Sequence, residues 1–368
     1  MKSIALAALG ALLLSACASS NRAPDASQGE VRDTVEASSP DSSATDGVWP
    51  EPIEPLPEAV LETEPAPEVV DDSWTTSDGA DADDTACPVA VIQVEEGEQV
   101  IPQTVLHLHG EGSHSGAGAI VTYQWTVEQP AGSVAWLIPS ATVPNPIFEA
   151  SVAGKYVFSL SVIDQAGRTS CSPAMLAVYV VPDEAIHVEL LWATPGDPDP
   201  TDEGPGAGTD LDLHVAHRLG SVCDADGDGL PEPWFDPHWD CYWANPHPDW
   251  GNPDPSVDDD PGLDRNDQDG GGPENVNLNI PEADPSTPFV YRVAVHYRDD
   301  HGFGSSFATL RIYIYSTLAF EVGDVEMQKG DLWEVATVEW PSTTIRLMLN
   351  AEGLYAIKPD YPEAPPCP

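Results

Sequence analysis

Hydrophobic and polar residues alternate with a period of two along most of the chain after residue 87, and no segment has a convincing helical period. Residues 156–162 are the clearest case, because Tyr156, Phe158, Leu160 and Val162 fall on one face of an extended strand. Residues 121–127 and 175–181 have the same pattern. The alternation predicts an all-β fold, and the roughly 280 residues after the N-terminal region suffice for two domains of ordinary size.

The N-terminal region has a different pattern. Residues 4–14 form a continuous apolar run that is too short for a transmembrane helix, which needs about 20 residues, and that is typical of a signal peptide. Residues 18–86 are rich in Pro, Ser, Ala, Asp and Glu, with only Trp49 and Trp74 as aromatics. Such a segment buries too little apolar surface to fold, so we expect a disordered, extended linker over residues 17–86.

The end of the apolar run resembles a bacterial lipobox, with the sequence Leu14-Ser15-Ala16-Cys17 after Lys2. The resemblance implies cleavage after residue 16 and a lipid on Cys17, which would attach the protein to a membrane. The residues that follow, Ala18 and Ser19, include no Asp at the second position, which favours the outer membrane. We therefore predict an outer-membrane lipoprotein of the cell envelope.

Residues 87–182 resemble a PKD-type, immunoglobulin-like domain. The likeness rests on Tyr123-Gln124-Trp125, on Pro130-Ala131-Gly132-Ser133, and on Gly154-Lys155-Tyr156 leading to Val162-Ile163-Asp164 and Gly167. The resemblance implies a β-sandwich with the Trp between its sheets and a turn from Asp164 to Gly167. Domains of this kind in exported bacterial proteins are mostly spacers or adhesion and binding modules.

Residues 183–368 resemble the YfaP-like family of exported bacterial proteins, with a long insertion between Val215 and Cys241. The resemblance implies a second antiparallel β-sandwich, and it implies no biochemical role. It rests on four segments that follow one another in the family's order: Asp210-Leu211-Asp212-Leu213-His214-Val215, Cys241-Tyr242-Trp243, Leu263-Asp264 through Asp269-Gly270-Gly271-Gly272-Pro273-Glu274-Asn275-Val276, and residues 291–297.

Five cysteines remain after Cys17 in a compartment that permits disulfides. Cys87 opens the first predicted domain and Cys171 lies near its last strand, so we expect a disulfide between them. Cys223 and Cys241 flank the insertion, and we expect a second disulfide there. Cys367 is then the free cysteine.

The charge is strongly negative, with 62 acidic against 13 basic residues and a formal net charge of −49. Such a surface repels nucleic acid phosphates, so no nucleic acid partner is expected. Acidic residues concentrate in the linker and between residues 195 and 285.

The insertion contains a sequence that fits the oxygen ligands of Ca²⁺. Carboxylates stand at loop positions 1, 3 and 5, Gly at 6, a backbone carbonyl at 7 and a carboxylate at 9. The alternative is a solvated acidic turn. The predicted ligands are Asp224, Asp226, Asp228, Leu230 through its carbonyl, and Glu232.

A second set of calcium ligands is predicted from the YfaP-like segments. Alternation puts Asp210 and Asp212 on the same strand face, where two carboxylates are costly unless they are exposed or neutralised by a cation. The alternative is a merely polar sheet face. The remaining predicted ligands are Asp264, Asp267, Asp269, Glu274 and Asn275.

Histidines offer zinc as another possibility, with His214 and His217 or His238 and His247 as pairs, but the surrounding hard oxygen ligands favour calcium. Six aromatics crowd the insertion, and we favour a small core there over a glycan-binding platform. They are Trp234, Phe235, Trp239, Tyr242, Trp243 and Trp250.

The sequence has no Gly-x-Ser-x-Gly elbow, no phosphate-binding glycine loop and no dinucleotide fingerprint. We therefore predict a non-enzymatic, lipid-anchored envelope protein that binds Ca²⁺ and has a binding, adhesion or structural role, with a protein or glycan as a possible ligand. The alternative from another class is a calcium-dependent hydrolase of polysaccharide or peptide.

Overall fold

The computed structural model describes residues 87–201, 204, 206–221, 231–254, 256–268, 270–283 and 287–362. Every regular element among these residues is a β-strand, which confirms the predicted all-β class. The described part of the chain contains no helix long and apolar enough to cross a membrane. Several predictions fall outside it: the signal peptide, the linker, Cys17, Cys223, Cys367, Asp269, and the loop residues Asp224, Asp226, Asp228 and Leu230.

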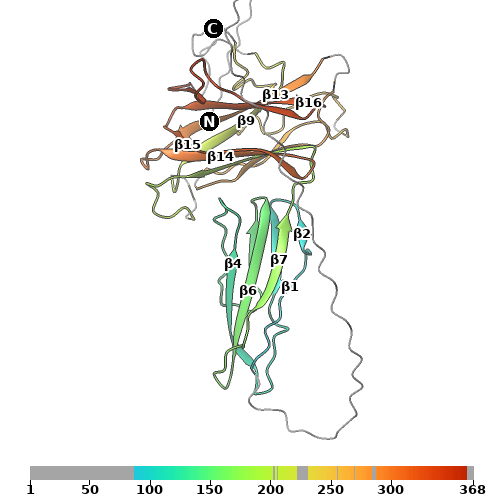
Figure 1. The fold of residues 1–368 in the computed structure, drawn as a ribbon, viewed down its shortest axis with the longest axis vertical. Coiled ribbons are helices and arrows are strands. Elements are labelled where there is room, and N and C mark those ends of the chain that lie inside the picture. The colour runs from blue at the N-terminus through green and yellow to red at the C-terminus, as the bar shows by residue number, and fades with distance from the viewer. Residues whose placement is uncertain are drawn as a thin grey trace, which may run out of the picture. The chain divides into compact units, whose positions relative to one another are not determined.

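Residues 87–180 form two sheets, with the strand orders β1-β3-β5 and β2-β7-β6-β4. The long strands β4, β6 and β7 correspond to the three alternating segments of the sequence and lie side by side (Figure 1). The strands are β1 (Gln93–Val94), β2 (Gln99–Val100), β3 (Thr104–His109), β4 (Ile120–Glu128), β5 (Ile147–Ala150), β6 (Gly154–Asp164) and β7 (Ala174–Val180).

The core of this sandwich follows from the alternation. Tyr156, Phe158, Leu160 and Val162 all point inward from β6 and are fully buried. Trp125 on β4 joins the same core, and its indole N–H donates to the carbonyl oxygen of Val143 at 2.9 Å. The Trp thus fills the space between the sheets, as the sequence predicts.

Two local predictions for this sandwich are confirmed. Cys87 and Cys171 form a disulfide with their Cα atoms 5.6 Å apart. The Asp164 carboxylate accepts the backbone N–H groups of Ala166 and Arg168, each at 3.0 Å, and so closes the expected turn. Gly167 has a φ of 77° in that turn, a conformation that glycine adopts without strain.

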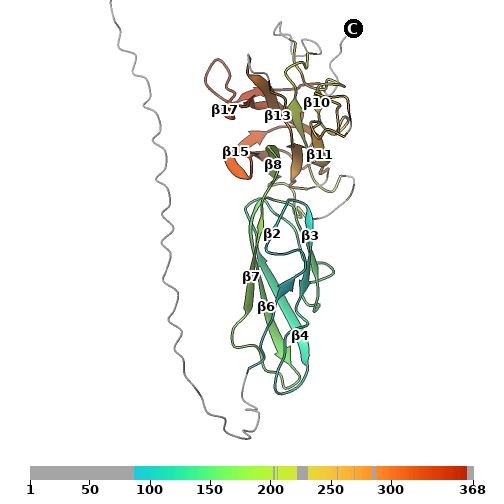
Figure 2. The ribbon, with the colours of Figure 1, turned by 90° about the vertical axis from the view of Figure 1, so that its right-hand side faces the viewer.

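Residues 186–358 form a second pair of sheets (Figure 2). One has the order β10-β9-β13-β16-β17, with β18 also on β16, and the other has the order β11-β12-β8-β14-β15. The strands are β8 (Ile186–Ala193), β9 (Asp210–Ala216), β10 (Asp240–Cys241), β11 (Gly262–Arg265), β12 (Glu274–Leu278), β13 (Phe289–Asp299), β14 (Ser306–Ile314), β15 (Thr317–Met327), β16 (Leu332–Trp340), β17 (Thr344–Leu347) and β18 (Ala356–Lys358).

The strand β9 shows how both faces of the first of these sheets are used. Leu211, Leu213 and Val215 point into the core between the sheets, while Ala216 belongs to a separate cluster on the outer face. In that cluster Trp234 and Phe235 cover the outer face, together with residues of β13 and β16. Residues 217–221 and 231–250, which we call the covering segment, therefore bury a sheet face that would otherwise be open to solvent.

The aromatic residues of the insertion confirm the core interpretation. Trp234 and Trp250 are fully buried, Phe235 is buried, and Trp239 and Trp243 pack partly buried against the main core. The indole N–H of Trp234 donates to Glu334 on β16 at 3.0 Å. A segment with few strands thus gains its own hydrophobic centre by packing on the sheet.

The predicted disulfide between Cys223 and Cys241 is not formed in the structure. Cys241 is a buried free thiol, and its expected partner lies outside the described residues. The reason is the position of Cys241 on β10, where its side chain faces the core and its thiol donates to the carbonyl oxygen of Pro246 at 3.4 Å. Proximity to the insertion in sequence did not translate into exposure to the loop.

Candidate functional site

Four predicted ligands meet where the edge of β9 approaches β12; we call Asp210, Asp212, Asp267 and Glu274 the acidic corner. The strand β10 pairs with β9 only at residues 215 and 216, so the edge of β9 before them lacks a strand partner on that side. The Glu274 carboxylate takes that place, because it accepts the N–H of Leu213 at 2.7 Å and the N–H of Asp267 at 3.2 Å. Glu274 thereby ties β9 to the loop before β12.

Burial and mutual repulsion perturb these carboxyl groups. Burial raises the pKa of Asp210 to about 7, and the neighbouring Asp212 adds to the effect. Burial also raises the pKa of Glu274 well above its ordinary value, with Asp212 and then Asp210 as further causes. Without a counter-charge, this part of the fold favours protonated carboxyl groups.

Several oxygens of the acidic corner have no hydrogen-bond partner. Asp212 is fully buried, and neither of its carboxylate oxygens is paired. Asp210 has one unpaired oxygen, and its other oxygen lies 3.4 Å from the guanidinium of Arg298. Buried polar atoms are normally paired, so these oxygens point to a missing partner such as a cation.

Two of the predicted ligands lie elsewhere, which corrects the predicted set. Asp264 is exposed on β11 and accepts a hydrogen bond from Asn277. Asn275 is buried, but it follows Glu274 on β12 and therefore points to the opposite face of the sheet, where it pairs in register with Glu189. Sequence adjacency placed these residues in one set, whereas the alternation of β11 and β12 separates them.

Of the Asp-rich loop, only Glu232 belongs to the described residues. Glu232 is buried and forms an ion pair with Lys358, with Nζ and Oε1 3.3 Å apart. The calcium site predicted for the rest of that loop stays a prediction.

A second polar group lies beneath the covering segment on the outer face of β9 and β13. The Nδ1 atom of His214 lies 2.7 Å from a carboxylate oxygen of Asp240, and both side chains are fully buried. His296 on β13 is also buried, and its Nδ1 lies 4.0 Å from Asp212. We call Asp212, His214, Asp240 and His296 the imidazole cluster.

His296 is the residue that sequence reasoning missed. Val293, Val295 and Tyr297 are in the core, so alternation alone could have placed His296 on the same outer face as Asp212 and His214. Its burial depends on the covering segment, which no periodicity predicts.

The histidine pairs considered from the sequence are not formed. His214 and His217 face different surroundings, since His217 lies 2.9 Å from Glu282 and stacks on Trp239. The side chain of His238 is 80% exposed. In the described residues, one group brings three ligating side-chain atoms within 4.8 Å of one another, and this group is Glu95, Glu96 and His107 at the surface.

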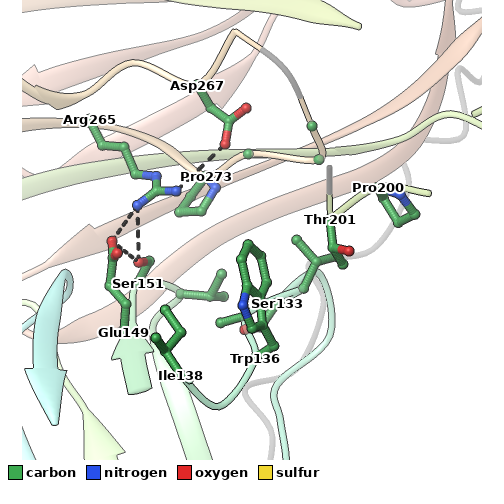
Figure 3. A pocket seen from close by; sticks show the side chains of 16 residues that line it. Ser133, Trp136, Ile138, Glu149, Ser151, Pro200, Thr201, Arg265, Asp267 and Pro273 are labelled. Atoms are coloured by element: carbon green, nitrogen blue, oxygen red, sulfur yellow. Dashed lines mark hydrogen bonds and ion pairs between the residues drawn. The ribbon is translucent and has the colours of Figure 1, made fainter. Parts of the chain in front are cut away.

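A surface pocket of about 110 Å³ lies beside the acidic corner (Figure 3). Trp136 and Ile138 form an apolar wall and are both more than 40% exposed. Opposite them, the Arg265 guanidinium contacts Glu149 and Ser151 and lies 3.7 Å from Asp267. The pocket thus combines an exposed indole with fixed polar groups, a combination suited to small ligands.

Comparison with known proteins supports part of the sequence interpretation. Residues 97–178 match a family model that describes a PKD domain. The predicted PKD-type domain is thereby confirmed for these residues. A comparison with curated proteins finds no match.

Two solved structures are similar to parts of the chain. The PKD1 domain of Epp from Vibrio anguillarum is 23% identical, with 26% of this chain and 95% of that domain covered and a TM-score of 0.19. A structure from a study of promiscuous carbohydrate-binding modules of the β-sandwich superfamily is 13% identical, with 64% of this chain and 98% of that one covered and a TM-score of 0.23. Both TM-scores are too low to support a conclusion about this chain.

Proposed function

We propose that the protein is a non-enzymatic lipoprotein of the bacterial cell envelope, with a binding or structural role, whose C-terminal β-sandwich is stabilised by Ca²⁺. The observation that carries the calcium proposal is the burial of Asp210, Asp212 and Glu274 together, with three carboxylate oxygens of Asp210 and Asp212 unpaired. A polar side chain in such a place requires a partner that no described residue supplies.

Calcium fits the chemistry of the acidic corner. Ca²⁺ takes six to eight oxygen ligands, mostly carboxylates and carbonyls, and tolerates irregular geometry. The corner offers carboxylates from β9, from β12 and from the intervening loop through Asp267. Because the carboxylates do not all lie within 4.8 Å of one another, the ion draws them together by side-chain rotation.

The cation also removes the electrostatic penalty of the site. Burial and like-charge repulsion raise the pKa of Asp210 to about 7, which describes the corner without a metal. A divalent cation reverses that balance, since it stabilises the ionised carboxylates. The C-terminal sandwich then depends on Ca²⁺ to hold the edge of β9 against β12.

The N-terminal sequence supplies the proposed location. Cys17 would carry the lipid, and residues 18–86 would separate the folded domains from the membrane surface. We place the protein at the outer membrane. An envelope compartment suits the disulfide between Cys87 and Cys171 and a calcium site of extracellular affinity.

The pocket beside Trp136 is the proposed position for a ligand. Its exposed indole resembles the aromatic surfaces on which sugar rings stack, and the Arg265 and Ser151 side chains could orient hydroxyl groups. A glycan array compares the full chain with the variant Trp136→Ala. Loss of a signal in the variant supports a glycan ligand, and no signal from the wild-type chain removes it.

The hydrolase alternative gains no support from the buried acid–base pair. His214 and Asp240 resemble a general base with its orienting carboxylate, but the side chains of both are 0% exposed. A substrate would have to displace the covering segment to reach them.

Calorimetric melting of the full chain tests the calcium proposal. EDTA is expected to lower the melting temperature of the C-terminal sandwich, and added calcium is expected to restore it. The transition of the PKD domain serves as the internal control and should not move. A melting curve that is the same with EDTA and with calcium would remove both predicted calcium sites.

A further inference from the structure

We infer that the imidazole cluster is a second metal site, built for a borderline transition-metal ion such as Zn²⁺. Its ligands are His214 Nε2, His296 and one oxygen of Asp212. Asp240 holds His214 in place from behind. This site goes beyond the proposed calcium site, with which it shares only Asp212.

The sheet brings the three ligands to one place. Asp212 on β9 and His296 on β13 are directly opposite each other in the register of the two strands. His214 lies two residues further along β9 and therefore projects from the same face as Asp212. The imidazole rings of His214 and His296 are 6.3 Å apart between centroids.

Each ligand carries an unused polar atom in a dry environment. His296 is 1% exposed and neither ring nitrogen has a hydrogen-bond partner. The same holds for Nε2 of His214 and for both oxygens of Asp212, and these two residues are fully buried. A buried unpaired polar atom costs about 1 to 3 kcal/mol, so five such atoms within one cluster indicate a ligand that satisfies several of them at once.

Asp240 performs the task that a carboxylate commonly performs behind a metal-bound histidine. It accepts the Nδ1 proton of His214 at 2.7 Å, which leaves a lone pair on Nε2 directed away from Asp240. The same oxygen of Asp240 accepts the N–H of Phe235 at 2.6 Å. Phe235 has a φ of 62°, so this hydrogen bond holds a non-glycine residue in the left-handed region beside the cluster.

The covering segment closes the cluster from outside. Tyr242 stacks on His214 with 5.0 Å between ring centroids, and Phe235 lies 4.7 Å from His214 and 5.3 Å from His296. This aromatic layer excludes water, which strengthens electrostatic attraction between a cation and Asp212.

The ligand types select the ion. Two imidazole nitrogens and one carboxylate oxygen suit Zn²⁺ and similar ions, whereas Ca²⁺ prefers oxygens alone. Two imidazoles on one tetrahedral ion have centroids about 5 Å apart, given zinc–nitrogen bonds of about 2 Å. The rings must therefore approach by about 1 Å from their present 6.3 Å separation. The three ligating atoms converge only on that movement, since they do not yet lie within 4.8 Å of one another.

Zinc titration of the full chain against a chromophoric chelator tests the site. The wild-type chain, after dialysis against a chelator, should take up zinc at this site. The variants His214→Gln and His296→Gln should each weaken that binding by at least 10-fold. The matched control is His238→Gln, because the side chain of His238 is 80% exposed and lies in the same covering segment. Zinc binding that is absent from the wild-type chain, or that the control weakens as much as His296→Gln, would overturn the inference.

A measurement on the wild-type chain covers the case in which a variant fails to fold. Co²⁺ replaces Zn²⁺ in tetrahedral sites and gives intense visible absorption bands there, which excess Zn²⁺ should abolish. A cobalt spectrum typical of six oxygen ligands would contradict the site.

The two metal proposals fail separately. His296→Gln should keep the calcium-dependent melting shift and lose zinc, whereas Asp210→Asn should lose the calcium shift and keep zinc. If calcium has no effect on the wild-type chain while zinc binds, the proposed function is wrong and the zinc site stands.

Discussion

Replacing Asp212 by Asn should reverse its effect on stability between calcium-free and calcium-saturated protein. The substitution keeps the shape of the side chain and removes a negative charge that is fully buried and whose two oxygens are unpaired. In EDTA it therefore relieves repulsion from Asp210 and Glu274. We expect a gain of about 1 to 3 kcal/mol in the free energy of unfolding of the C-terminal sandwich.

With calcium the order is inverted. A ligand present at 100 times its dissociation constant stabilises the folded state by about 2.7 kcal/mol. For a domain of this size the gain corresponds to about 5 to 11 °C in melting temperature. The variant lacks a central ligand and should gain little, so calcium should place the wild-type chain above it.

Differential scanning calorimetry measures both orders, with the PKD domain as the internal reference. Asp249→Asn is the matched control, because Asp249 is an exposed carboxylate in the covering segment. It should follow the wild-type chain in both conditions. If Asp212→Asn is less stable than the wild type in EDTA, or gains as much from calcium, the reasoning about the acidic corner is refuted.

Three further predictions concern other parts of the chain. Cys171→Ser opens a link between residues 84 apart, so chemical denaturation should show the PKD domain less stable by about 4 to 5 kcal/mol, and an unchanged midpoint would be inconsistent. Burial alone would raise the pKa of Asp164, but hydrogen bonds from Arg168 and Ser115 outweigh it and lower that pKa. Asp164 therefore stabilises the fold above the ordinary carboxyl pKa, and the stability difference from Asp164→Asn should vanish as the pH falls through the lowered pKa. Cys17→Ala should move the protein from the detergent phase to the aqueous phase in a detergent partition assay, and retention in the detergent phase would argue against lipid on Cys17.

Alternation carried the sequence interpretation a long way. It located β4, β6 and β7 and put Asp210 and Asp212 on one face of a strand, because side-chain direction in a strand depends only on position. Composition and turn chemistry likewise identified the turn at Asp164.

What remained depended on contacts between distant segments. Asp264 and Asn275 were grouped with Glu274 because they are close in sequence, but the pairing of β11 with β12 and of β12 with β8 decides which face each occupies. His296 became a candidate only once the covering segment was seen to bury it. The free thiol of Cys241 has the same origin, since β10 turns it into the core.

Direct calcium titration by calorimetry tests the central claim most directly. The full chain, freed of metal, should bind calcium saturably. Glu274→Gln should remove one binding site from the stoichiometry, because Glu274 joins β9 to the loop at Asp267 within the acidic corner. The contradictory result is a wild-type chain that binds no calcium at millimolar concentration, or a Glu274→Gln variant whose stoichiometry and affinity equal those of the wild type.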